Sequence, residues 1–171
     1  EVVRPGRRVQ MVEASLSGEG GEVVRARAWR LRTGSIELPA GVSEPAPPPG
    51  PERGSQPEFF ATGDSVGYHT AMEWKAISGE FREPGPATVW MRMRHPLVPG
   101  EEPSPLQRTL IAADVGNGIS SIVDWTSHTF VNVDLTIHLE RQPVGEWVCV
   151  DAVTHAGPEG IGTSESVLGD R

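Results

Sequence analysis

This sequence has only one cysteine, no long apolar run and no excess of positive charge. Cys149 is its single cysteine, so an internal disulfide framework is excluded and we expect a reducing, cytoplasmic location. No run of about 18 apolar residues occurs, so we expect no membrane span. The formal net charge of −8 argues against a nucleic-acid partner, because phosphate contacts require a basic surface. The first residue is Glu1 rather than Met, so we expect translation to start upstream.

Glycine and proline are abundant, and the charge is distributed unevenly. The 20 Gly and 16 Pro favour many short elements joined by turns over long helices. Residues 1–33 hold seven Arg and four Glu, a net +3, whereas residues 34–171 hold 8 basic and 19 acidic residues, a net −11. The basic segment is either a solvated strand face or a surface that meets an anionic ligand.

The first 67 residues predict a hairpin followed by a linker. Residues 9–16 and 23–31 have strand-like patterns, and the Gly-rich cluster 17–21 between them predicts an antiparallel turn. A lone hairpin is only marginally stable in water, so residues 1–33 need a further sheet. The proline-rich stretch 34–67 is typical of a linker, in which Phe59 and Phe60 are expected to dock.

Residues 68–171 predict an α+β domain with antiparallel strands. Ser104 as N-cap and Pro105 at the first helical position begin a helix that we expect to run over 104–125. Gly116 and Gly118 interrupt it, each at a cost of about 1 kcal/mol. Strands are expected on both sides of this helix, over 72–77, 87–94, 130–139, 146–155 and 162–168.

Two groups of polar residues are candidates for chemistry. Asp114 and Asn117 lie three residues apart and share a helix face, where the apolar setting of Asp114 calls for a partner or a bound water. On the strand 130–139, Asn132 and Asp134 alternate with apolar residues, so that one face is polar. The alternative is that both groups simply face solvent.

Other familiar sites are not indicated. The five histidines lack metal-ligand spacing, so we expect no metal site. Asp151 and His155 lie near Ser164 and Ser166 in sequence, but no nucleophile-elbow motif accompanies them. Cys149 lies in an alternating strand and is expected to be a small core residue.

Several segments, in this order, resemble the acyl-CoA thioesterase II-like proteins, which have two fused hot-dog units. Residues 2–9 and 23–31 look like the closing strands of a first unit. The run Ile111-Ala-Ala-Asp-Val-Gly-Asn117 resembles the central helix of the second unit around its catalytic aspartate. Residues 130–139, with 141–143 and 145–147, are similar to the following strand and turn, and 163–170 to the penultimate strand.

The resemblance implies a double hot-dog fold, in which an antiparallel sheet wraps a long central helix and the first unit is incomplete. Residues 1–33 would be the last hairpin of that first unit, 34–67 the linker, and 68–171 the second unit without its last strand. The family's catalytic aspartate falls on Asp114. Its helper threonine falls near Asn132, where this sequence departs from the pattern, and its glutamine would lie beyond Arg171.

The implied activity is hydrolysis of acyl-CoA thioesters by a water that Asp114 activates. Asn132 would hold this water, and Asn117 and Asp134 would position the substrate; coenzyme A would be part of the substrate, with no separate cofactor. An enoyl-thioester hydratase or dehydratase is one alternative, and it would recruit His128 or His138. A non-catalytic acyl-CoA binding or assembly module is another, favoured by the Thr-to-Asn departure. We also expect a homo-oligomer or association with the missing segment, because an incomplete sheet leaves unpaired edges.

Overall fold

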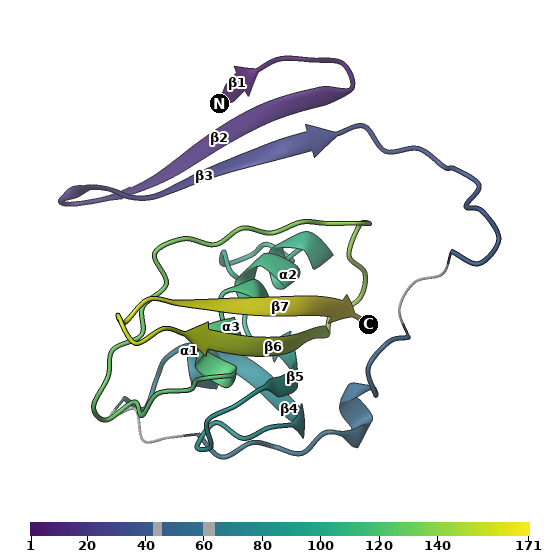
Figure 1. The fold of residues 1–171 in the computed structure, drawn as a ribbon. Helices are drawn as coiled ribbons and strands as arrows, with labels where there is room; N and C mark the ends of the chain where they lie inside the picture. The colour runs from purple at the N-terminus through teal and green to yellow at the C-terminus, as the bar shows by residue number, and fades with distance from the viewer. Residues whose placement is uncertain (43–45, 60–63) are drawn as a thin grey trace. The chain divides into compact units, whose positions relative to one another are not determined.

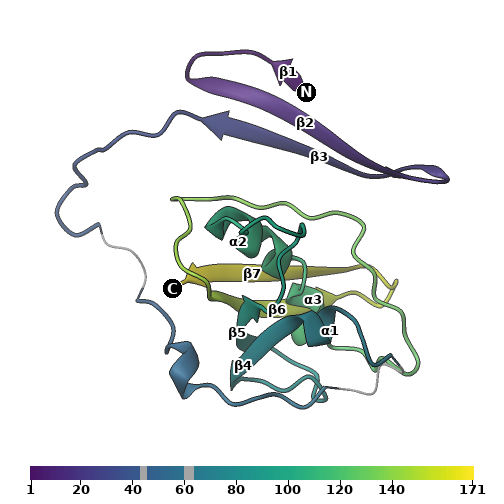
Figure 2. The ribbon, with the colours of Figure 1, turned by 180° about the vertical axis from the view of Figure 1, so that it is seen from behind.

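The computed structural model describes residues 1–42, 46–59 and 64–171. The chain divides into two compact units, Glu1–Pro45 and Ala46–Arg171 (Figures 1 and 2). Each unit contains one antiparallel sheet, and the helices of the chain are few and short. None of the helices among the described residues has the length and apolar character needed to cross a bilayer.

The first unit is a three-stranded antiparallel sheet in the order β1-β2-β3. The strands β2 (Val9–Gly18) and β3 (Gly21–Leu31) form the hairpin that the sequence predicts, and β1 (Val2–Arg4) pairs with β2. Glu13 pairs with Arg27 across the hairpin, and Arg4 lies over the ring of Trp29. The strand residues are exposed or half-buried, because three strands cannot cover an apolar face of their own.

The second unit contains a four-stranded antiparallel sheet in the order β4-β5-β6-β7. Its strands are β4 (Met72–Ser78), β5 (Ala87–Met93), β6 (Val148–Ala156) and β7 (Gly162–Asp170), close to the predicted ranges. The helices α2 (Pro105–Ala113) and α3 (Gly116–Ile119) pack against β5, β6 and β7. A short helix, α1 (Tyr68–Ala71), leads into β4.

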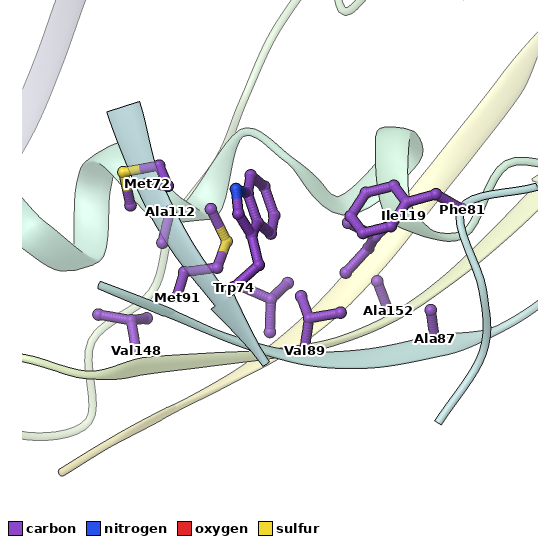
Figure 3. Packing of buried hydrophobic residues seen from close by; sticks show 11 residues of the cluster. Met72, Trp74, Phe81, Ala87, Val89, Met91, Ala112, Ile119, Val148 and Ala152 are labelled. Atoms are coloured by element: carbon purple, nitrogen blue, oxygen red, sulfur yellow. The ribbon is translucent and has the colours of Figure 1, made fainter. Parts of the chain in front are cut away.

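The core of the second unit lies between the helices and the inner face of this sheet. Trp74, Val89 and Met91 point from β4 and β5 toward Ala112 and Ile119 of the helices (Figure 3). All five side chains are almost fully buried. Alternation of apolar residues with period two on the strands, and the apolar stripe on the helix, produce this two-layer packing.

The proline-rich stretch is part of the second unit from Ala46 onward. On the outer face of the sheet, the indole of Trp90 donates to the carbonyl O of Pro49 over 2.7 Å. The 3₁₀ turn η1 (Pro51–Arg53) follows, and Ser55 forms a β-bridge with Ala76. Phe59 docks as predicted, 4.5 Å from the ring of Phe81 between centroids, whereas Phe60 lies outside the described residues.

The prediction of one helix over 104–125 is wrong. Its start is confirmed, since Ser104 caps α2 and forms a capping box with Gln107. The helix ends at Ala113, because Asp114 and Val115 have ψ angles near zero that tighten the turn. The two glycines that follow support only the four-residue α3, and the chain leaves the helix at Ser120.

The prediction of a strand over 130–139 is also wrong. This segment has no strand pairing in the part of the chain that the structure describes, although its sequence alternates. Val131 and Val133 are 71% and 95% exposed, so the apolar face that motivated the strand is uncovered. Alternation predicts an extended chain, but a strand also requires a neighbour that accepts its backbone hydrogen bonds.

Candidate active site

Asp114 is the C-cap residue of α2, at the turn between α2 and α3. The expectation of an apolar seat for this carboxylate is wrong, because its side chain is exposed while Ala112 and Ala113 face the core. Neighbouring helix positions point in different directions, so the apolar residues beside Asp114 in sequence do not enclose it. The carboxylate is accessible to water and to a ligand.

The partner of Asp114 is Asn132. The Asn132 side-chain amide donates from Nδ2 to Oδ1 of Asp114 over 2.8 Å and to the carbonyl O of the same residue at 3.2 Å. Asn117 holds the same segment in place, since its Nδ2 donates to the carbonyl O of Phe130 at 3.2 Å. The structure therefore brings Asp114, Asn117 and Asn132 together at one edge of the helix layer.

The other polar residues of this segment are not part of the cluster. Asp134 is exposed and has no hydrogen bond or ion pair with any residue that the structure describes. His128 contacts Ser127, with 2.9 Å between Nδ1 and Oγ, and lies in a turn. His138 is exposed, and none of its described neighbours bonds to it. No histidine is thus hydrogen-bonded to Asp114 among the described residues.

Tyr68 is a neighbour of the site that sequence reasoning missed. Its hydroxyl donates to the carbonyl O of Ile111 over 2.9 Å, and its ring meets Trp74 edge-on at 5.8 Å. Burial of the hydroxyl raises the pKa of Tyr68 above its ordinary value, and the negative charge of Asp114 raises it further. The only signal in the sequence was that Tyr68 opens the globular region, which does not place it beside Asp114.

Hydroxyl groups lie between α3 and the sheet and hold them together by hydrogen bonds. Ser120 Oγ donates to the carbonyl O of Gly116 over 2.8 Å and lies 2.7 Å from Thr154 Oγ1. Gly116 itself faces β7, where a β-carbon would come within 2.5 Å of Ser166 Oγ and 2.9 Å of Ser164 Oγ. The close approach that Gly116 permits fixes the turn carrying Asp114 against the sheet.

Asp151 and Cys149, which the sequence also singled out, both lie on β6. Asp151 accepts a hydrogen bond from Thr88 over 2.9 Å, on the outer face of the sheet. Burial raises the pKa of the Cys149 thiol to about 12, so it stays protonated at neutral pH. No group of three His, Cys, Asp or Glu side chains within the described ranges is arranged to hold a metal ion.

A comparison with known families decides the identity of the chain. Residues 42–171 match the model of the acyl-CoA thioesterase C-terminal domain. The chain belongs to this family. The resemblance drawn from the residues is thereby confirmed. No curated protein and no solved structure matches the chain.

Membership of the acyl-CoA thioesterase family gives the site its chemical context. It indicates acyl-CoA as the substrate and hydrolysis of the thioester as the reaction. The antiparallel sheets and few helices are compatible with a hot-dog-like α+β fold.

Proposed function

We propose that this thioesterase-family protein hydrolyses acyl-CoA with Asp114 as general base. The observation that carries the proposal is the bond from Asn132 to Oδ1 of Asp114, which orients an accessible carboxylate. The amide occupies one carboxylate oxygen and leaves Oδ2 for a water molecule. A hydrogen-bonded, correctly aimed carboxylate is what general-base hydrolysis requires.

In the proposed reaction, the water donates a proton to Asp114 while its oxygen attacks the thioester carbonyl carbon. The tetrahedral intermediate collapses with cleavage of the C–S bond, and coenzyme A leaves as a thiolate. The proton held by Asp114 then passes to the thiolate or to solvent, which restores the carboxylate. No covalent acyl-enzyme forms, so neither Ser nor Cys is needed as a nucleophile.

The supporting roles extend this proposal to neighbouring residues. Asn117 holds the 130–132 segment through its bond to Phe130, so that Asn132 faces Asp114. Asp134, on the same extended segment, would contact the substrate rather than the water.

We further propose a double hot-dog arrangement in which β1, β2 and β3 close the first unit. Coenzyme A enters as part of the substrate, and the reaction uses no separate cofactor.

Hydrolysis of a series of acyl-CoA substrates by the full chain, followed by thiol release, tests the proposal. We expect Asp114→Asn to retain binding and to lose kcat by about 100-fold or more, the scale of general-base catalysis. Glu165→Gln is the matched control, since it likewise converts an exposed carboxylate to an amide, but on β7 rather than at Asp114. Equal turnover by both variants would remove Asp114 from the mechanism.

Binding without hydrolysis is the second candidate, and Asn132 favours it. The amide offers no hydroxyl at the position where the family has threonine. Tight binding of acyl-CoA by the wild-type chain with no thiol release at any acyl length would identify a binding module. The same assay therefore separates the two functions.

A further inference from the structure

A cavity of about 240 Å³ opens at the end of β5, beside the first turn of α2. Three arginines and two glutamates are part of its lining. The charged and titratable groups around it are Arg92, Arg94, His95, Glu102, Arg108 and Glu146. It is separate from the Asp114 cluster, which lies at the other end of α2.

Two of these arginines are fixed by carboxylates. Arg92 pairs with Glu73 over 2.7 Å and approaches Glu146 at 3.4 Å. Arg108 pairs with Glu102 and donates to the carbonyl O of Gly145 over 3.0 Å. These two guanidinium groups form the walls of the cavity, and their positive charges are already compensated.

Arg94 and His95 are different, because neither forms an ion pair with a carboxylate among the described residues, although the charge of Glu73 also acts on Arg94. Arg94 uses Nε to bond the carbonyl O of Met72 over 3.0 Å, which anchors the side chain and leaves its terminal nitrogens without a partner in the described structure. His95 is exposed and equally without a described partner. An anchored guanidinium with free donors suits a phosphate oxygen.

We infer that this cavity receives a phosphate group of coenzyme A, with Arg94 as its principal contact. The inference rests on the proposed acyl-CoA hydrolysis. Residues 34–171 hold 8 basic and 19 acidic residues, and this cavity gathers three of the basic ones, of which Arg94 forms no ion pair with a described residue. The nine residues of α2 span about 14 Å between the cavity and Asp114. The pantetheine arm can extend over such a span, with the thioester at Asp114.

Kinetics with three thioesters of one acyl group tests the inference: acyl-CoA, acyl-dephospho-CoA and acyl-pantetheine. We expect Arg94→Gln to raise KM for acyl-CoA about tenfold at unchanged kcat, the effect of losing a contact made equally in ground and transition states. For acyl-pantetheine, KM should not change. Arg53→Gln, an exposed arginine of η1, is the matched control.

The truncated substrates identify which phosphate binds. If Arg94→Gln raises KM for acyl-CoA but not for acyl-dephospho-CoA, the 3′-phosphate occupies the cavity. If the variant raises KM for both of these substrates and not for acyl-pantetheine, the diphosphate occupies the cavity. Equal KM for acyl-CoA in the wild type and Arg94→Gln would overturn the inference. If no thioester is hydrolysed, the proposed function fails by itself. Calorimetric binding of CoA and dephospho-CoA to the two proteins then still decides the phosphate contact.

Discussion

Asn132 donates its side-chain amide to the carboxylate of Asp114 over 2.8 Å from 18 residues further along the chain. The second bond, to the backbone carbonyl of Asp114, fixes the amide so that its nitrogen faces the carboxylate. This pairing joins the end of α2 to the extended segment after α3. It is the geometric basis of the proposed mechanism.

Replacing Asn132 should lower turnover without unfolding the protein. We expect Asn132→Ala to reduce kcat about tenfold, because the carboxylate loses its orienting donor but remains present. Asn132→Asp should reduce it further, since a second carboxylate repels Asp114. Steady-state kinetics with a denaturation curve for each variant gives the result.

A double-mutant cycle provides the control for Asn132. If both residues act on one water, Asn132→Ala should add little to the loss already caused by Asp114→Asn. Independent, multiplicative losses in the double variant would show that the two side chains act separately.

Asp170 is predicted to stabilise the segment before β6. The Asp170 side chain is 7% exposed, and its carboxylate pairs with Arg141. The backbone N–H of Val144 donates to the same carboxylate over 2.6 Å. Hydrogen bonding by Arg141 lowers the pKa of Asp170, so this stability is present at neutral pH and is lost as the pH falls through the lowered pKa.

We expect Asp170→Asn to lower the free energy of unfolding by about 2 kcal/mol at neutral pH. Urea denaturation of the wild type and the variant at neutral and at acidic pH measures this difference in the free energy of unfolding. The difference should disappear at acidic pH. A loss of the same size with Glu165→Gln, an exposed carboxylate on the same strand, would attribute the effect to net charge instead.

Cys149 should make the folded state sensitive to alkaline pH. Its pKa is raised from 9.0 to about 12 in the fold, so the unfolded chain loses the thiol proton first. The unfolded state then binds fewer protons, and stability falls as the pH rises from about 9 toward 12, by up to about 1.4 kcal/mol per pH unit.

Guanidinium denaturation at about pH 8 and about pH 10, in the wild type and Cys149→Ala, measures this dependence. We expect the variant to lose about 1 kcal/mol at the lower pH from its smaller side chain, and to show a shallower decline at the higher pH. Parallel declines in both proteins would assign the pH dependence to other groups.

The sequence was most informative where one pattern determines one element. The hairpin over 9–31 and the strands β4 to β7 follow from alternation bounded by glycine turns, and Ser104 with Pro105 predicts the start of α2. Helix ends and strand pairing depend on more distant residues. Gly116 ends up against Ser164 and Ser166 of β7, a contact that no local pattern contains.

The candidate site shows the same limit. The sequence singled out Asp114, Asn117 and Asn132, and the structure places them together. The sequence also predicted an apolar enclosure for Asp114, but this side chain is exposed. The prediction was wrong because periodicity does not show which side of a helix the following loop covers. Tyr68 approaches from before β4, so its position beside Asp114 depends on tertiary packing alone.

The most direct measurement is single-turnover hydrolysis of a saturating acyl-CoA by the wild type and by Asp114→Asn, which isolates the chemical step from binding and release. The proposed mechanism predicts a chemical rate at least about 100-fold lower in the variant, with the affinity for acyl-CoA retained. The same rate in both proteins would contradict it, because the water would then be activated without the carboxylate that Asn132 orients.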